Sequence, residues 1–151
     1  TMRKIIRDIE KSDYVFKPVF NQGLDLWLPK DRQISNSICQ HASQLSEQTK
    51  ASAIICMTYS GYNAIKMSSL RPTSFVHVFT NNYSILNKLS LVWGVQAYYY
   101  DREATTDQTI IETKEILRTN KYIKKGDYIV NLASMPAYEK GMTNMVKLSK
   151  V

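Results

Sequence analysis

Short apolar runs recur along the chain from residue 53 onward. The run 53–57 (AIICM) is wholly apolar, which is typical of a strand buried on both faces of a sheet. Further runs at 75–79, 95–100 and 128–132 predict three more strands. Residues 145–148 alternate in hydrophobicity and predict a fifth strand at the end of the chain.

Helical periodicity fills the segments between these runs. Apolar positions spaced by three and four residues predict an amphipathic helix over 34–49, and shorter helices over 64–70 and 85–89. A fourth helix is expected to begin near Thr105, because Thr105 and Gln108 have the spacing of a capping box.

Strands that alternate with helices in this way predict a mainly parallel sheet. The segment 133–144 is too short for a helical crossover, so the last two strands should be antiparallel. We therefore expect an α/β fold, a three-layer α/β/α sandwich with a five-stranded, mostly parallel sheet whose last strand is antiparallel.

The N-terminal part of the chain has a different character. Met2, Ile5, Ile6 and Ile9 have helical spacing, but the helix that they predict begins without a cap. Residues 14–32 contain two prolines and a glycine and read as a connector. We expect residues 1–13 to belong structurally to another unit and residues 33–151 to form the compact domain.

Length and composition are those of one globular domain. The chain has 151 residues, of which 44% are hydrophobic and 22% charged, with a net charge of +7. The basic residues are scattered, which argues against a nucleic-acid surface. The sequence shows no leader and no apolar stretch near about 20 residues, so we expect a cytoplasmic protein without a membrane partner.

The turn Thr58–Asn63 is the most informative local feature. It joins the carboxyl end of a buried strand to the start of a helix, where open α/β sheets bind ligands. Backbone N–H groups, the helix dipole and the hydroxyls of Thr58 and Ser60 would favour a phosphate, and Gly61 permits close approach. An ordinary turn with Ser60 as N-cap is the other interpretation.

No catalytic set of residues emerges from the sequence. His41 and Cys39 fall on the helix 34–49, and His77 and Cys56 fall in strands, where packing or surface roles are the ordinary ones. No spacing suggests a metal site, and we expect no cofactor in this chain. The residues thus favour a binding or assembly module over a complete enzyme.

Several short motifs occur along the chain in a characteristic order: 58–64 (TYSGYNA), Arg71-Pro72, 91–95 (LVWGV), 124–127 (KKGD) and 141–144 (GMTN). They include a Thr-x-Ser-Gly turn, an Arg-Pro step, a Leu-x-Trp-Gly-Val sequence and a loop before the last strand. In this order they resemble the C-terminal domain of pyruvate kinases.

The resemblance implies a specific role. Pyruvate kinases transfer phosphate from phosphoenolpyruvate to ADP, with Mg²⁺ and K⁺, on a barrel domain. Residues 1–13 resemble the last helix of that barrel, so the chain would be a piece of a longer polypeptide and inactive alone. The C-terminal domain of the family binds phosphorylated effectors and helps to build a homotetramer.

Carried over to this sequence, the effector site comprises the turn 58–63 and the loop before the last strand: Thr58, Tyr59, Ser60, Gly61, Tyr62, Asn63, Lys140, Gly141 and Thr143. Many relatives have arginine at the position of Tyr62, and tyrosine cannot provide a bidentate grip on phosphate. An assembly domain without an effector, or a free-standing module for phosphorylated ligands, are the alternatives.

Overall fold

The computed structural model describes residues 1–12, 27–102, 105–135 and 142–151. Within these ranges the chain forms the following helices and strands: α1 (Met2–Glu10), α2 (Lys30–Thr49), β1 (Ala53–Met57), α3 (Tyr62–Ser69), β2 (Phe75–Thr80), α4 (Tyr83–Leu89), β3 (Val95–Tyr99), α5 (Thr106–Thr119), β4 (Tyr128–Ala133) and β5 (Met145–Lys150).

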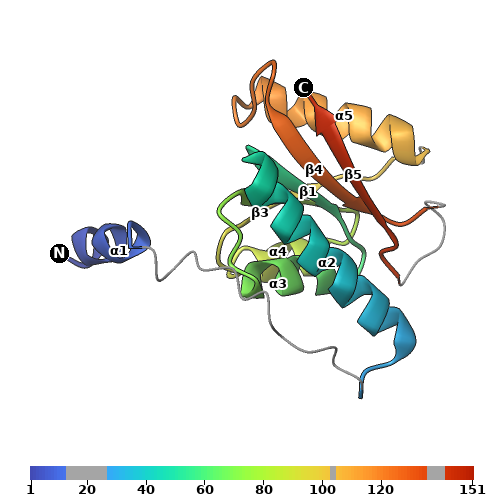
Figure 1. The fold of residues 1–151 in the computed structure, drawn as a ribbon, viewed down its shortest axis with the longest axis horizontal. Helices are drawn as coiled ribbons and strands as arrows, with labels where there is room; N and C mark the ends of the chain where they lie inside the picture. Colours follow the sequence, from blue (N-terminus) through green and yellow to red (C-terminus); the bar gives the residue numbers. More distant parts are fainter. Residues whose placement is uncertain (13–26, 103–104, 136–141) are drawn as a thin grey trace.

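The five strands form one sheet in the order β3-β2-β1-β4-β5 (Figure 1). β1, β2, β3 and β4 are parallel, with Ala53 opposite Phe75 on one side and Ile129 on the other. β5 pairs antiparallel with β4, because the short link between them cannot cross over the sheet. The fold predicted from the sequence, including the reversed last strand, is confirmed.

Alternating residues of the central strands face two apolar clusters. Ile54 and Cys56 belong to the cluster that α2, α3 and α4 cover, whereas Ala53 and Ile55 belong to the second cluster. The second cluster includes Leu117 of α5, which therefore packs on the opposite face of the sheet from α2. Both faces are covered, and this explains why β1 is wholly apolar.

The strand order reverses beside β1. The chain runs from β1 to β2 and β3 through α3 and α4 on one face, and then returns to β4 through α5 on the other face. The carboxyl ends of β1 and β4 are therefore adjacent at the point where the strand order reverses. This is the place where open α/β sheets form a ligand crevice.

α2 is longer than the sequence pattern suggested. It begins at Lys30 after Pro29, three residues before the start of the expected domain. It ends at Thr49, and its C-cap, Lys50, has a left-handed backbone (φ 50°). In the described part of the chain, no helix has the length and apolar character needed to cross a membrane.

Candidate functional site

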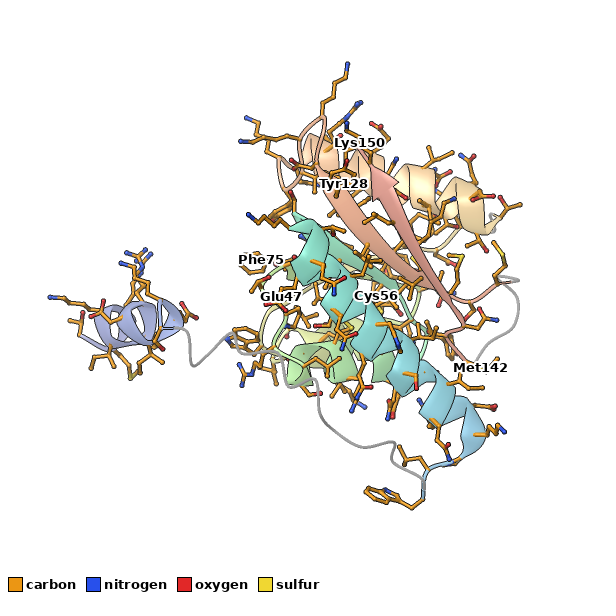
Figure 2. The ribbon with its side chains drawn as sticks, in the orientation of Figure 1. Glu47, Cys56, Phe75, Tyr128, Met142 and Lys150 are labelled. Carbon is orange, nitrogen blue, oxygen red and sulfur yellow. The ribbon has the colours of Figure 1, made fainter. Side chains whose placement is uncertain are left out.

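A cavity of about 970 Å³ lies at the carboxyl ends of β1 and β4 and extends between the sheet and the first half of α5. In Figure 2, Phe75 and Tyr128, at the amino ends of β2 and β4, lie at the other end of the sheet from Met142. The lining comes from the β1–α3 turn, both central strands, the α5 N-terminus and the segment before β5. It includes Thr58, Ser60, Tyr62, Thr106, Asn131 and Thr143.

The β1–α3 turn is shaped by its own hydroxyl groups. Thr58 Oγ1 accepts a hydrogen bond from the amide of Gly61 at 3.0 Å, and Ser60 Oγ accepts one from Tyr62 at 3.4 Å. Two of the amides expected to face a ligand therefore have partners within the turn. The N-cap of α3 is Gly61, without a side-chain cap, so the interpretation of Ser60 as N-cap is wrong.

Glycine is required at position 61 for two reasons. Its φ of +77° is left-handed, where side chains are disfavoured. A Cβ there would also lie 2.9 Å from Ile85 Cγ2 of α4. Gly61 thus allows the turn to pack against α4 and positions the first turn of α3. In that first turn, the amides of Asn63 and Ala64 have no acceptor among the described residues.

The segment before β5 is fastened to the turn. The side-chain amide of Asn63 donates a hydrogen bond to the hydroxyl of Thr143, and the amide of Thr143 donates to Ser35 Oγ of α2 at 3.2 Å. Asn63, Thr143 and Ser35 are all buried. This wall of the cavity is therefore held by contacts between three segments that are distant in the sequence.

Tyr62 links the N-termini of α2 and α3. Its hydroxyl donates to Asn36 Oδ1 at 2.8 Å, and the guanidinium carbon of Arg32 lies 3.8 Å from the centroid of its ring. Both Arg32 and Tyr62 line the cavity. A positive charge from α2 thus stands beside the turn, next to the tyrosine.

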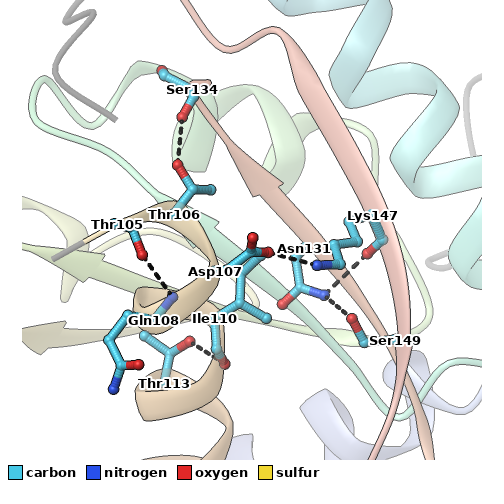
Figure 3. Close-up of polar contacts among 10 residues, drawn as sticks. All are labelled: Thr105, Thr106, Asp107, Gln108, Ile110, Thr113, Asn131, Ser134, Lys147 and Ser149. Atoms are coloured by element: carbon cyan, nitrogen blue, oxygen red, sulfur yellow. Dashed lines mark hydrogen bonds and ion pairs between the residues drawn. The ribbon is translucent and has the colours of Figure 1, made fainter. Parts of the chain in front are cut away.

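The opposite wall is the N-terminus of α5. Thr105 caps this helix by accepting from the amide of Gln108 at 3.3 Å, as predicted, but the Gln108 side chain donates to Glu112 instead of returning to Thr105. Only half of the expected capping box therefore forms. Thr106 Oγ1 donates to the carbonyl of Ser134 at 3.4 Å, which joins α5 to the end of β4 (Figure 3).

Asn131 of β4 places a polar group in the floor of the cavity. Its Nδ2 donates to the carbonyl of Lys147 and to Ser149 Oγ, both at 3.0 Å, on the β5 side (Figure 3). Its Oδ1 is buried and has no hydrogen-bond partner within the described chain. A buried acceptor without a partner is costly, and a ligand that donates a hydrogen bond would satisfy it.

Within the described chain, two of the four charged side chains that line the cavity are ion-paired, and a third accepts a hydrogen bond. Arg102 lies 3.1 Å from Glu112, Asp107 lies 2.8 Å from Lys147, and Asp101 accepts from Tyr99 at 3.1 Å. Hydrogen bonds, first from Gln108 and then from Tyr100, lower the pKa of Glu112. Burial raises the pKa of Tyr100, which donates to Glu112 at 2.9 Å and stays neutral.

Cys39, Cys56 and His77 are buried and do not line the cavity. Burial raises the pKa of Cys39 to about 12 and that of Cys56 further, so both thiols stay protonated. Burial also lowers the pKa of His77 to about 4. Among the described residues, no three His, Cys, Asp or Glu side chains gather in a group that could hold a metal. The arrangement is suited to binding.

Comparison with known proteins identifies the family. A family model described as "Pyruvate kinase, alpha/beta domain" matches residues 36–149. The chain belongs to this family. It is 34% identical over 118 residues to a pyruvate kinase of Clostridium acetobutylicum, and 27% identical over 119 residues to one of Lactobacillus delbrueckii subsp. bulgaricus. These matches cover 78% and 79% of this chain but 24% and 20% of the relatives.

The chain therefore spans between a fifth and a quarter of the length of these pyruvate kinases. The same holds for "Pyruvate kinase 2" of Synechocystis, which is 29% identical over 118 residues, with 20% of its length covered. The recognition of a pyruvate kinase C-terminal domain from its motifs is confirmed.

In this pyruvate kinase domain, the structure brings most of the expected site residues to one cavity. Thr58, Tyr59, Ser60, Tyr62, Asn63 and Thr143 line it, and Gly61 shapes the turn from behind. Lys140 and Gly141 lie outside the described residues. Their assignment to an effector site stays a prediction.

Sequence reasoning missed three parts of the cavity of this pyruvate kinase domain. Arg32 was assigned to the connector, although it belongs to the first turn of α2. Thr106 was not singled out, because the capping signal at this helix start is carried by Thr105 and Gln108. Asn131 carried a usable signal, because it is the one polar residue in the run 128–132 apart from the tyrosine at its start.

Proposed function

We propose that this chain is the regulatory and oligomer-forming domain of a pyruvate kinase, and that its cavity binds a small phosphorylated effector. The single observation that carries the binding proposal is the cavity itself. It opens where the strand order reverses, beside the first turn of α3, and has hydroxyls and an arginine at its wall. Its 970 Å³ exceeds what a lone phosphate fills and suits a metabolite-sized molecule.

The buried acceptor of Asn131 supports a ligand with two chemical ends. A phosphate at the turn would meet amides, hydroxyls and a positive charge. The body of the ligand would lie over Ile55 and Phe79 on the floor of the cavity and donate a hydrogen bond to Asn131 Oδ1. A hydroxyl-bearing sugar or an amino-bearing base satisfies this requirement, whereas a simple hydrocarbon does not.

The activity of the complete protein is part of the proposal. We infer that the parent polypeptide transfers phosphate from phosphoenolpyruvate to ADP in glycolysis, in the cytoplasm, with Mg²⁺ and K⁺. A barrel domain joined to this one would carry that chemistry, and no residue described here is assigned to the ions. Self-association, as a tetramer in the parent, is supported by β5, which forms one edge of the sheet and exposes Leu148.

An assembly domain without an effector is the second candidate. The hydrogen bonds inside the β1–α3 turn favour it, because they already satisfy the amides of Gly61 and Tyr62. The two candidates differ in one measurable property, which is the binding of phosphorylated compounds.

Thermal unfolding with a panel of ligands tests the proposal. The panel comprises inorganic phosphate, sugar phosphates, sugar bisphosphates and nucleoside monophosphates, each beside its unphosphorylated counterpart. A ligand at tenfold its Kd stabilises the native state by about 1.4 kcal/mol, so Tm should rise by a few degrees. A flat panel at millimolar concentrations would favour the assembly domain.

A pair of variants locates the binding. Ser60→Glu adds a negative charge to the exposed turn at the cavity and should abolish the Tm shift. Ser69→Glu makes the same change at the other end of α3, outside the cavity, and should keep it. Equal shifts in both variants would place the ligand elsewhere.

A further inference from the structure

Arg32 differs from the other arginine of the cavity, Arg102. Among the described residues, the charged side chains that line the cavity are Arg32, Asp101, Arg102 and Asp107. Arg102 is paired with Glu112, and Asp107 with Lys147. Within the described part of the chain, Arg32 has no carboxylate partner, and its side chain lies over the ring of Tyr62. Its charge is therefore available for a ligand.

The contact with Tyr62 holds the guanidinium in a defined place. The guanidinium carbon lies 3.8 Å from the ring centroid, well within the range of a cation–π interaction. Tyr62 is itself fixed at both ends, because it is the first residue of α3 and its hydroxyl donates to Asn36 Oδ1 at 2.8 Å. Arg32 and Asn36 are separated by one turn of α2, so α2 supplies both contacts.

Such a contact leaves the hydrogen-bonding capacity of arginine intact. A guanidinium over an aromatic ring uses its face, while its N–H groups point outward in the plane and can bind two oxygens of one phosphate. Since the carbon of Arg32 is close to the ring, most of its donors remain for a partner in the cavity.

We propose that Arg32, held against Tyr62, is the anion-anchoring and specificity-determining residue of the cavity, and that it selects ligands carrying a phosphate monoester. The proposal rests on the proposed function and adds a residue from α2 to it. A phosphate has oxygens for Arg32, for the hydroxyls of Thr58 and Ser60, and for the first-turn amides of α3. A carboxylate has too few oxygens for all of these groups.

Titration of the 151-residue chain with inorganic phosphate, followed calorimetrically and by ³¹P NMR, tests this role. Arg32→Gln should weaken phosphate binding at least tenfold, and Arg32→Lys should retain part of the affinity. The matched control is Arg71→Gln. Arg71 also lies over an aromatic ring, that of Trp93 at 4.3 Å, but does not line the cavity, so this variant should change the affinity less than twofold.

Variants at Tyr62 test whether its ring holds the guanidinium of Arg32 in the position that binds phosphate. Tyr62→Phe keeps the ring and should bind phosphate nearly as well as the wild type. Tyr62→Leu removes the ring and should weaken binding severalfold. Combined with Arg32→Gln, it should add little, because both changes remove the same contact. Urea unfolding of each variant checks that the fold is kept.

The results of these titrations distinguish the role of Arg32 from the proposed binding of a phosphorylated effector. If the wild type binds phosphate and Arg32→Gln binds it equally well, the role of Arg32 is refuted while the proposed function stands. If Arg71→Gln weakens binding as much as Arg32→Gln, the effect is one of net charge, and the anchoring role is again refuted. If the wild type binds neither phosphate nor any phosphorylated compound of the panel, the proposed function fails, and the role of Arg32 fails with it.

Discussion

The side chain of Asn63 donates a hydrogen bond to the hydroxyl of Thr143, 80 residues further along the chain. The contact joins the first turn of α3 to the segment that precedes β5, at the wall of the cavity. Because both residues are buried, the pair should contribute to stability as well as to the shape of the site.

Thr143→Val should destabilise the domain by about 1–3 kcal/mol, because the amide of Asn63 would be left buried without an acceptor. Thr143→Ser retains the hydroxyl and should lower the free energy of unfolding by less than half as much as Thr143→Val. Urea unfolding measures both free energies of unfolding. Equal losses in the two variants would show that the methyl group, and not the hydrogen bond, matters at this position.

Gly61→Ala should be more destabilising than Gly126→Ala. Both glycines have positive φ, +77° and +97°, so alanine costs about 1–2 kcal/mol at each from backbone strain. Only at Gly61 would the new Cβ also meet a side chain, Ile85, at 2.9 Å. Thermal or urea unfolding compares the two variants, and equal costs would contradict the close packing of the turn on α4.

His77 should make the stability of the domain depend on pH in the acidic range. Burial lowers its pKa to about 4, whereas the unfolded chain has the ordinary value of about 6.5. Between these values the unfolded state binds more protons, so stability falls as pH decreases from about 6.5 to about 4, by up to about 3 kcal/mol, and is unaffected above about pH 7.

Urea unfolding at several pH values checks the effect of His77. His77→Phe should remove most of this pH dependence while keeping a ring beside Tyr98 and Tyr122, whose centroids lie 5.8 and 5.0 Å from that of His77. His41→Gln changes an exposed histidine and should keep the dependence. An unchanged slope in His77→Phe would assign it to other groups.

The 151-residue chain should form no pyruvate from phosphoenolpyruvate and ADP. Its cavity contains hydroxyls, amides, the ion-paired Arg102 and Asp107 and the charge of Arg32, and its thiols are buried and protonated. An assay coupled to lactate dehydrogenase detects ADP-dependent pyruvate formation. Turnover that survives purification of the chain would contradict the assignment of catalysis to another domain.

The strands and the layer order could be predicted from the sequence because burial on both faces of a parallel sheet leaves an unmistakable apolar run, as in 53–57. The start of α2 could not be predicted, because its first turn, Lys30–Arg32, is polar and shows no apolar periodicity. That boundary is the reason why Arg32 was placed in a connector and not at the site.

The β1–α3 turn shows a second limit of prediction from the sequence. The residue types of the turn predict an anion site, but hydroxyl groups can either bind a ligand or bond to nearby amides. The structure shows the second arrangement for Thr58 with Gly61 and for Ser60 with Tyr62. Side-chain direction decides between these uses, and periodicity carries no information about it.

The central claim, that the cavity binds a phosphorylated ligand, is tested most directly by ¹H–¹⁵N NMR of the chain during titration with the panel compound that raises Tm most. The account predicts saturable amide shifts concentrated at residues 58–64 and 105–109, on the two walls of the cavity. The absence of shifts with every compound of the panel, or shifts confined to the basic turn at 124–126, would contradict it.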